Sequence, residues 1–490
     1  MYRFFTLIII VSMLFPLKGA AREMPLTLDD AIIMARVKSV NAAVALDELK
    51  TAYWEWRTYR ADRLPEIGFN ATIPSYVNRY SSYMNSEGEY SFVRNRYLDA
   101  QAQLSVTQNI TLTGGKLSLN SSLDFLHQYG DDGGDRFMSI PIALTLTQPI
   151  LGVNTLKWNS RIEPVRFAEA KAAFLSATED VAIATVNYFF TLIMSRENVA
   201  ISKQNLANAR KLYTVAVEKR KMGQISENDL LQMELNMLDA QSSLTDCQST
   251  LKSDMFTLRS FLDLEEDVEI IPVVPQAVPV AEINFNDALD RALANNKFAQ
   301  NIRRRQLEAD YEVAKAKGDM RQINLFAQIG YTGTDTDASG AYSRLRGNQL
   351  VEVGFSIPLV DWGKRRGKVK VAESNRRVTE SRLRQETMNF NQELFVLVER
   401  FCNQQQQLSI ATRSNEIAQR RYETNVETFL IGKISTLDLN DSQTKKDESM
   451  RQYVNELYKF WSYWYQIRSI TLYDYEHHTD INADIDKLVR

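Results

Sequence analysis

Cysteine, histidine and long apolar runs are scarce in this chain. Its 490 residues include two cysteines and three histidines, and 58 Lys and Arg stand against 61 Asp and Glu, for a formal net charge of -3. Two thiols do not form a disulfide scaffold, and the histidines show no metal-ligand spacing. The balanced charge argues against a nucleic-acid partner. Because no nucleophile elbow or phosphate loop occurs either, we expect no enzyme and no cofactor.

The N-terminus carries the longest apolar run. Residues 1–21 combine Arg3, an apolar stretch at 4–15 and a small-residue end, which predicts a cleaved secretory signal. The signal has no cysteine for a lipid anchor. No later stretch contains about 18 consecutive apolar residues, so we expect no transmembrane helix. Cys247 and Cys402 are expected to be small, buried helix residues.

Two stretches share the pattern Gly-x-Ile-Ser-x-x-Asp, about 209 residues apart, each inside a polar, helix-favouring run. Glycine suits the left-handed position that ends a helix, serine suits the next N-cap, and aspartate three residues on completes a capping box. Each stretch therefore predicts the tip of an antiparallel helical hairpin. The residues are Gly223, Ile225, Ser226 and Asp229 in the first tip and Gly432, Ile434, Ser435 and Asp438 in the second.

The repeat extends beyond the tips. "LTLDDAIIMARVKSVN" near the N-terminus is answered by "INFNDALDRALANNK" at 283–297, with Ala31 and Ala35 matched by Ala288 and Ala292. Between the copies, several prolines predict an extended linker. Three-four apolar spacing predicts long helices, in which about 60 residues would reach about 90 Å. The expected helices are 155–222, 226–264, 363–431 and 435–473.

Other segments alternate apolar and polar residues with period two. In the stretch "QAQLSVTQNITL", Ala102, Leu104, Val106, Ile110 and Leu112 alternate with Gln, Ser, Thr and Asn. One apolar and one uncharged polar face is typical of membrane barrel strands, although a half-buried sheet of a soluble sandwich alternates in the same way. Long polar loops at 78–96, 127–135 and 332–348 and a tight turn at 112–117 favour the barrel. The strand candidates are 66–77, 101–112, 116–126, 138–150, 322–332 and 349–359.

Taken together, the doubled plan, the passage "PLVDWGKRRGKVKVA" and the two tips resemble the TolC-like outer membrane efflux protein family. The resemblance implies an α+β membrane protein built from two tandem repeats: a trimeric outer-membrane β-barrel continued by a long α-helical periplasmic barrel. It implies a passive exit duct of a tripartite efflux or type I secretion system, located in the outer membrane with its helical part in the periplasm. The implied partners are two further copies of the chain, a periplasmic adaptor protein, an inner-membrane pump and outer-membrane lipid.

On this basis the chain is divided as follows: signal peptide 1–21; periplasmic helix of repeat 1, 22–63; barrel strands of repeat 1, 64–151; helical hairpin of repeat 1, 152–265; linker 266–283; periplasmic helix of repeat 2, 284–320; barrel strands of repeat 2, 321–360; helical hairpin of repeat 2, 361–473; polar tail 474–490. The first copy departs from the family pattern in having four strand candidates. Its 112–117 hairpin either joins and enlarges the barrel or packs elsewhere.

The resemblance also suggests roles for tip residues. An acidic pair just past the second tip would narrow the tunnel entrance, and Asp438 and Asp441 fit that place, three residues apart on one helix face. In the alternative interpretation, Asp438 only completes a capping box. The other tip residues named above would contact the adaptor, whereas His477 and His478 are expected in a solvated tail. A rival function is a periplasmic coiled-coil adaptor or scaffold, which would lack the alternating strands.

Overall fold

A computed structural model describes residues 22–84, 88–130, 133–275, 277–356, 360–430, 433–434 and 436–489. The predicted signal at 1–21 therefore lies outside the described residues, as do Gly432 and Ser435 of the second tip. The chain divides into two compact units. The first comprises residues 1–50, 170–299 and 387–490, and the second comprises residues 51–169 and 300–386.

The helices and strands follow the periodicities of the sequence closely. Each of the four long helices begins and ends within three residues of its expected bounds. The helices are α1 (Leu28–Lys38), α2 (Val40–Ala61), α3 (Thr155–Lys221), α4 (Glu227–Phe261), α5 (Phe285–Asn295), α6 (Lys297–Gly318), α7 (Ala338–Ser343), α8 (Lys364–Leu430), α9 (Thr436–Thr471) and α10 (Ile485–Val489). The strands are β1 (Arg22–Leu26), β2 (Glu66–Met84), β3 (Tyr90–Ile110), β4 (Gly115–Gln128), β5 (Gly134–Leu151), β6 (Val268–Pro272), β7 (Gln322–Asp335), β8 (Leu345–Ser356), β9 (Tyr473–Asp474) and β10 (Thr479–Asp480).

In the first unit, corresponding segments of the two copies pair with each other. Strand β1 precedes α1 and pairs in parallel with β6, which precedes α5. The segment predicted as a linker therefore contains a strand. Side-chain oxygens cap both helices, from Thr27 and from Asn284. The four alanines that match between the copies are all fully buried, so the repeated sequence marks positions where only a small side chain fits.

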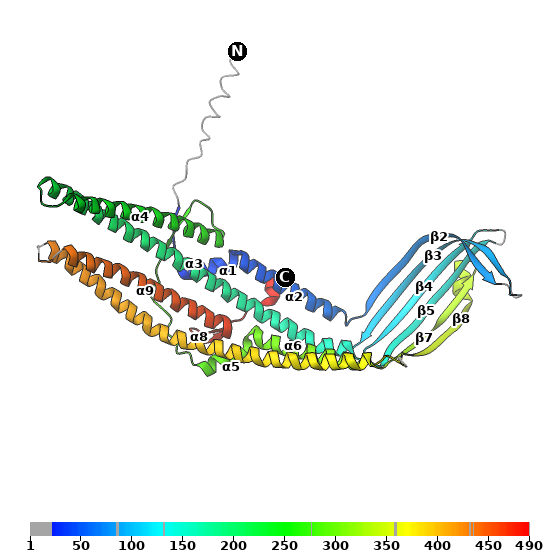
Figure 1. Cartoon of the computed structure of the whole chain (residues 1–490). Helices are drawn as coiled ribbons and strands as arrows, with labels where there is room; N and C mark the ends of the chain where they lie inside the picture. Colours follow the sequence, from blue (N-terminus) through cyan, green and yellow to red (C-terminus); the bar gives the residue numbers. More distant parts are fainter. Residues whose placement is uncertain are drawn as a thin grey trace, which may run out of the picture. The chain divides into compact units, whose positions relative to one another are not determined.

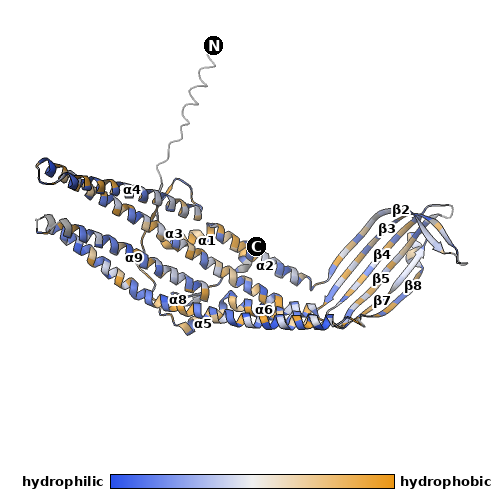
Figure 2. Cartoon of the chain, in the orientation of Figure 1, coloured by the Kyte–Doolittle hydropathy of each residue, from blue (hydrophilic) through white to orange (hydrophobic). Residues whose placement is uncertain are grey.

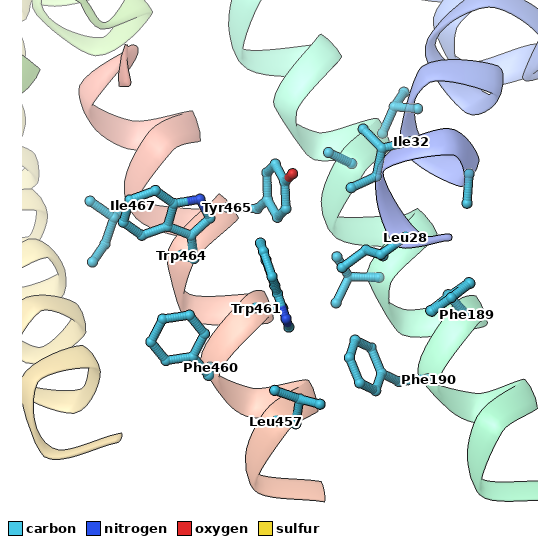
Figure 3. Packing of buried hydrophobic residues seen from close by; sticks show 14 of the residues in the cluster. Leu28, Ile32, Phe189, Phe190, Leu457, Phe460, Trp461, Trp464, Tyr465 and Ile467 are labelled. Atoms are coloured by element: carbon cyan, nitrogen blue, oxygen red, sulfur yellow. The ribbon is translucent and has the colours of Figure 1, made fainter. Parts of the chain in front are cut away.

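An aromatic core holds the first unit together (Figure 3). Trp461 of α9 lies on the side of Phe190 of α3 and Leu28 of α1, whereas Phe460 and Trp464 lie on the other side of α9, next to Phe401 of α8. Phe189 of α3 and Ile32 of α1 belong to the same cluster. Trp464 is almost fully buried and lies 5.9 Å from Phe401 between ring centroids. Burial of such side chains away from water is the main driving force for packing these helices.

A network of buried charges lies beside this core. Glu179 of α3 is nearly inaccessible and pairs with Arg36 of α1 and Arg468 of α9. Arg468 also reaches Asp474 in β9 at 2.8 Å. Partial burial opposes ionisation of Asp474, but the hydrogen bond and charge of Arg468 lower its pKa to about 2.

The tail and the thiols differ from expectation. Tyr473 and Tyr475 belong to the core of the first unit, so the tail is anchored. His477 is exposed and contacts Asp474. Cys247 is half-buried, whereas Cys402 is exposed, and both thiols are free. The expectation of two buried thiols was therefore wrong for Cys402, which lies on an exposed face of its helix.

The second unit contains one antiparallel six-stranded sheet with the order β2-β3-β4-β5-β7-β8 (Figure 1). Its β3–β4 turn includes Gly114 at φ +78°, a conformation that L-amino acid side chains disfavour. This hairpin lies within the sheet, so it does not pack elsewhere. The strands β2 and β8 form the free edges.

Hydrophobic and hydrophilic residues alternate along the strands of the sheet (Figure 2), and its two faces differ in polarity. Residues paired across antiparallel strands share a face, so the register identifies each side. One face is mostly apolar, with Ile67, Phe69, Leu104, Val106, Leu117, Leu119, Ile142, Leu144, Leu146, Leu325, Ile329, Tyr331, Val351 and Val353. The opposite face is mostly uncharged and polar, with Gln101, Gln103, Ser105, Thr107, Asn109, Ser118, Asn120, Thr145, Thr147, Gln328 and Asn348.

Local irregularities correct parts of the expected alternation. Register shifts between Asn120 and Ser122 against β5, and between Ser139 and Ile142 against β7, put Met138 opposite Asp124 and Thr334, on the polar side. Ser139 is fully buried instead and donates a hydrogen bond to the carbonyl of Ala341 in α7. Leu112 lies in the turn rather than on a strand.

The predicted loop at 78–96 is mostly strand. Strand β2 continues to Met84 and β3 starts at Tyr90, and these ends pair with each other in an unbroken register. Strand β4 stops at Gln128, opposite Tyr97. We call residues 78–84 and 90–96 the arm, a two-stranded extension beyond the end of β4.

Candidate functional site

The features that stand out in the described residues are helical hairpin tips and a sheet with two unlike faces. Within these ranges, no group of three or more His, Cys, Asp or Glu side chains is placed to hold a metal ion. None of the described helices combines the length and apolarity that a membrane span requires. The candidate sites are therefore the hairpin tips of the first unit and the two-faced sheet of the second.

The first tip joins α3 to α4 through the local chemistry expected from its sequence. Gly223 adopts φ +71°, and the amide of Gln224 donates to the carbonyl of Lys219. Together with the bond from Gly223 to Arg220, this is a Schellman end to α3. The tip thus begins with a left-handed residue that glycine adopts without strain.

A capping box starts α4. The hydroxyl of Ser226 accepts from the amide of Asp229, and the Asp229 carboxylate accepts from the amide and the hydroxyl of Ser226. The hydroxyl bond first, and then the amide bond, lower the pKa of Asp229. Ile225 is half-buried directly before the cap. The predicted cap residues Gly223, Ser226 and Asp229 therefore act together.

The second tip is described in part. The amide of Lys433 donates to the carbonyl of Thr428 at 3.1 Å. The first tip has the same kind of hydrogen bond, from the amide of Gln224 to the carbonyl five positions earlier. Ile434 is half-buried, like Ile225. Asp438 is exposed in the first turn of α9. Since Ser435 lies outside the described residues, the alternative capping box of Asp438 stays a prediction.

Asp441 has a partner that the sequence reasoning missed. Arg421 of α8 donates to its carboxylate at 2.8 Å, and both side chains are about half exposed. The pair joins the two helices of the second hairpin one turn beyond Asp438. Only the register of the hairpin could have predicted it, because the two residues are 20 positions apart.

The two hairpins also contact each other through amides. Gln443 of α9 is buried, accepts a hydrogen bond from Asn208 at 2.6 Å and donates to Asn205 at 3.0 Å. Both asparagines lie on α3. A buried amide with its donor and acceptor satisfied fixes the alignment of helices that apolar contacts alone would leave free to slide.

The polar face of the sheet carries mostly uncharged side chains that can form hydrogen bonds with water. Serine, threonine, asparagine and glutamine predominate, and the few charges include Lys116, Asp124 and Glu352. Phe326 and Leu350 are apolar exceptions on this face. Such a surface presents hydrogen-bonding groups with little net charge.

Comparison with known proteins agrees with this architecture. Residues 288–471 match the model of the family described as outer membrane efflux protein, whose members are transport conduits rather than enzymes. No curated protein sequence matches the chain.

Solved outer-membrane channels have the same fold. The CmeC outer membrane channel of Campylobacter jejuni aligns with a TM-score of 0.64 at 15% identity, covering 94% of this chain and 88% of that one. The outer membrane protein VceC of Vibrio cholerae gives 0.61 at 14% identity, covering 91% and 95%. The MtrE outer membrane channel of Neisseria gonorrhoeae gives 0.57 at 10% identity, covering 93% and 91%. These findings confirm that the chain is similar to the TolC-like outer membrane efflux protein family, in sequence over residues 288–471 and in fold over nearly all of its length.

Proposed function

We propose that this protein is a passive outer-membrane exit duct, assembled from three copies. The observation that carries the proposal is the six-stranded sheet, whose one face is apolar, whose other face is polar and whose edges β2 and β8 are open. In lipid, unpaired edge amides and carbonyls are costly, so such a sheet must close with other copies. Closure would turn the apolar face to lipid and the polar face to an aqueous channel.

The strand count fits closure between copies. Six strands that alternate in direction leave β8 antiparallel to β2, so β8 of one copy can pair with β2 of the next without changing the pattern. Three copies with six strands each would make a barrel of eighteen strands. Barrels of about 16–18 strands leave an open aqueous channel. The β3–β4 hairpin would therefore enlarge the barrel.

The helical unit would continue the duct through the periplasm. Its capped tips would meet a periplasmic adaptor, and an inner-membrane pump of a tripartite efflux or type I secretion system would drive transport. Supporting this are the family match, the shared fold with outer-membrane channels and the two similarly closed tips. The rival function, a periplasmic adaptor or scaffold, gains no support from the sheet, because a soluble adaptor has no use for its exposed apolar face.

The first experiment tests membrane insertion and assembly. We expect the mature protein to require detergent for extraction and to run as a trimer that dissociates on heating. In planar bilayers it should form stable, water-filled channels. Recovery of a soluble monomer after lysis without detergent would refute the duct.

A second experiment separates the tips from the sheet. Gly223→Val requires a β-branched residue at φ +71° and should disturb closure of the first tip. Adaptor binding should fall while trimers still insert and conduct. The matched control is Gly367→Ala in α8, where a Cβ meets nothing within 4 Å and φ is not positive. Loss of insertion in the Gly223 variant alone would contradict this division of roles.

A further inference from the structure

The arm formed by residues 78–84 and 90–96 has no partner strand among the described residues besides its own two halves. The ladder between β3 and β4 stops at Tyr97, while β2 and β3 remain paired up to Met84 and Tyr90. At about 3.3 Å per residue, seven residues extend about 20 Å. Nothing in the duct function requires this extension.

A bulge in β2 between Thr72 and Ser75 precedes the arm. Pro74 lies inside the bulge and has no amide hydrogen to donate, which suits an edge strand. Strand β3 passes the same point without any shift against β4. The face assignments of β3 therefore continue from the sheet into the arm.

One face of the arm continues the apolar face of the sheet. The pairs of the arm on this face are Asn78–Arg96, Tyr80–Arg94, Ser82–Phe92 and Met84–Tyr90, and the pair Tyr76–Leu98 precedes them. They follow Leu104 and Val106 along β3 with period two. Phe92, Tyr90 and Tyr80 are 78%, 75% and 68% exposed. Large aromatic side chains are thus presented to the surroundings just beyond the apolar part of the sheet.

Two exposed arginines lie among these aromatic side chains, and each contacts a neighbouring side chain. Arg94 donates its Nε to the side-chain oxygen of Asn78 at 3.0 Å, which uses one of the five donors of a guanidinium. The guanidinium carbon of Arg96 lies 4.9 Å from the centroid of the Tyr129 ring. Tyr76 packs edge-on against the same ring. Preorganised guanidinium groups bind phosphates with little loss of side-chain freedom.

The opposite face of the arm differs in composition. It carries Ser81, Ser91 and Asn95, with Arg79 and Tyr83 as its large exposed side chains. The side chain of Asn95 donates to the hydroxyl of Ser81 on this side. Arg79 thus offers an arginine on the same arm but outside the aromatic stripe.

We propose that the face of the arm with Tyr80, Phe92, Arg94 and Arg96 binds the phosphorylated headgroups of glycolipid in the outer leaflet. The inference rests on the proposed function, because it is the duct that puts the apolar face of the sheet in lipid. Past the hydrocarbon boundary, the same face meets the headgroup layer. Aromatic rings stack on sugar rings and line such boundaries, and the two guanidinium groups complement phosphate charge.

Two features of the arm indicate which molecule binds there: its continuity with the apolar face of the sheet and its two positive charges. A protein partner would not need to lie on the lipid-facing side, directly beyond an apolar surface. A neutral lipid would not need two fixed cations between exposed aromatic rings. An anionic glycolipid satisfies both the position and the chemistry.

The test uses the full-length protein purified in detergent and diphosphorylated lipid A as the probe. Native mass spectrometry counts the lipid A molecules retained per assembly over a titration. The double variant Arg94→Gln/Arg96→Gln should bind lipid A about tenfold more weakly, since it loses charge-assisted hydrogen bonds. Arg79→Gln, on the opposite face, should stay within about twofold of the unsubstituted protein.

Further measurements keep the outcomes distinct. Tyr80→Ser/Phe92→Ser should also weaken binding, and lipid A without phosphates should bind the original protein about as weakly as the double arginine variant binds lipid A. Equal retention in all variants, or an equal loss in Arg79→Gln, would overturn the proposal. All preparations are checked for channels in phosphatidylcholine bilayers. If the double arginine variant forms channels and binds lipid A as well as the unsubstituted protein does, the proposed lipid site on the arm is refuted. If the unsubstituted protein forms no channels, the proposed duct function itself is refuted.

Discussion

The two units of this protein differ in how far their large apolar side chains are exposed. In the helical unit, Phe189, Phe401 and Phe460 are at most 1% exposed. In the sheet of the other unit, Ile67 and Val351 are each 72% exposed. The hydrophobic effect favours burial of apolar side chains in both units. Only the first unit buries these side chains within one chain.

This difference separates a unit that buries its apolar surface within the chain from a unit that leaves such surface exposed. Monomeric proteins in water rarely expose a contiguous apolar surface as large as one face of a six-stranded sheet. Under the proposed function, lipid and further copies would cover this face of the sheet, whereas the aromatic core of the helical unit is already buried within one chain. Substitutions in the two units should accordingly be detected by different measurements.

The largest expected effect is in the helical core. Trp464→Ala leaves a cavity beside Phe401 and should destabilise the helical unit by about 3–5 kcal/mol. Urea unfolding followed by the helical circular dichroism signal measures this loss. The milder Ile467→Val, also at a fully buried position, should cost about 1 kcal/mol.

The control for this core substitution is Val351→Ala on the exposed face of the sheet. Its effect on the helical transition should be below about 0.5 kcal/mol. If Val351→Ala shifted that transition as much as Trp464→Ala, the contrast between the two units would be wrong.

The second prediction concerns the sheet and uses two neighbouring residues. Leu144 lies on the apolar face, opposite Leu119 and Ile329, whereas Thr145 lies on the polar face, opposite Ser118 and Gln328. Leu144→Arg should lower the stability of the inserted protein by about 2–4 kcal/mol per chain, because it puts a charge in lipid.

Thr145→Arg is the matched control, with the same charge one residue away. It should insert nearly as well as the original protein and alter ion selectivity instead. The measurement is the fraction of heat-modifiable trimer in the membrane, together with folding into vesicles at increasing urea. Equal insertion of both variants would mean that the two faces are not distinguished by lipid and water.

The third prediction concerns the anchored tail. The pKa of Asp474 falls from 3.8 to about 2 in the folded protein, so its ionised form stabilises the fold above pH 4. This contribution, about 2 kcal/mol, is lost as the pH falls from about 4 to 2. Asp474→Asn should lower the free energy of unfolding by a similar amount at pH 7, and the difference should vanish near pH 2.

The tail offers a second carboxylate for comparison. Asp484 pairs with Lys487 three residues later, and both side chains are exposed. Asp484→Asn should therefore change stability by less than about 0.5 kcal/mol at any pH. A pH-independent loss in Asp474→Asn would show that its packing matters and its charge does not.

The sequence predicted the long helices and the six strands because their signals are local. Apolar stripes, left-handed glycines and capping pairs act within a few residues, and Gly223 and Ser226 show how strongly they fix a tip. The arm was missed because tyrosine, serine, arginine and asparagine alternate there without a continuous apolar face. Those side chains suit a loop equally well, and only the pairing of Met84 with Tyr90 shows the strand.

Contacts between distant segments could not be predicted at all. Glu179 meets Arg36 and Arg468 across 143 and 289 residues of sequence. The pairing of β1 with β6 was hidden by Pro25 and Pro272, which predict an extended chain but not its partner. In each case the energy comes from packing that no short window of sequence contains.

The smallest expected effect is at the second tip. There the carboxylate of Asp441 is exposed although it belongs to the helical unit. If Asp438 and Asp441 line the tunnel entrance as symmetric rings, Asp441→Asn should weaken the cation selectivity of the channel. The ion pair with Arg421 is exposed, so the change in stability should stay below about 1 kcal/mol. Selectivity in planar bilayers at low salt is the measurement, because screening is least there.

Arg421 makes this prediction sharper than the acidic pair alone allows. Its guanidinium lies 2.8 Å from the Asp441 carboxylate and offsets part of that charge. Arg421→Gln should therefore increase cation selectivity, Asp441→Asn should decrease it, and the double variant should return close to the original value. Asp438→Asn is a poorer test, since with the predicted capping box it would combine a lost charge with a weakened helix start. If neither Asp441→Asn nor Arg421→Gln changes selectivity at low ionic strength, in variants that insert as trimers, the pair lies away from the ion path and only joins α8 to α9.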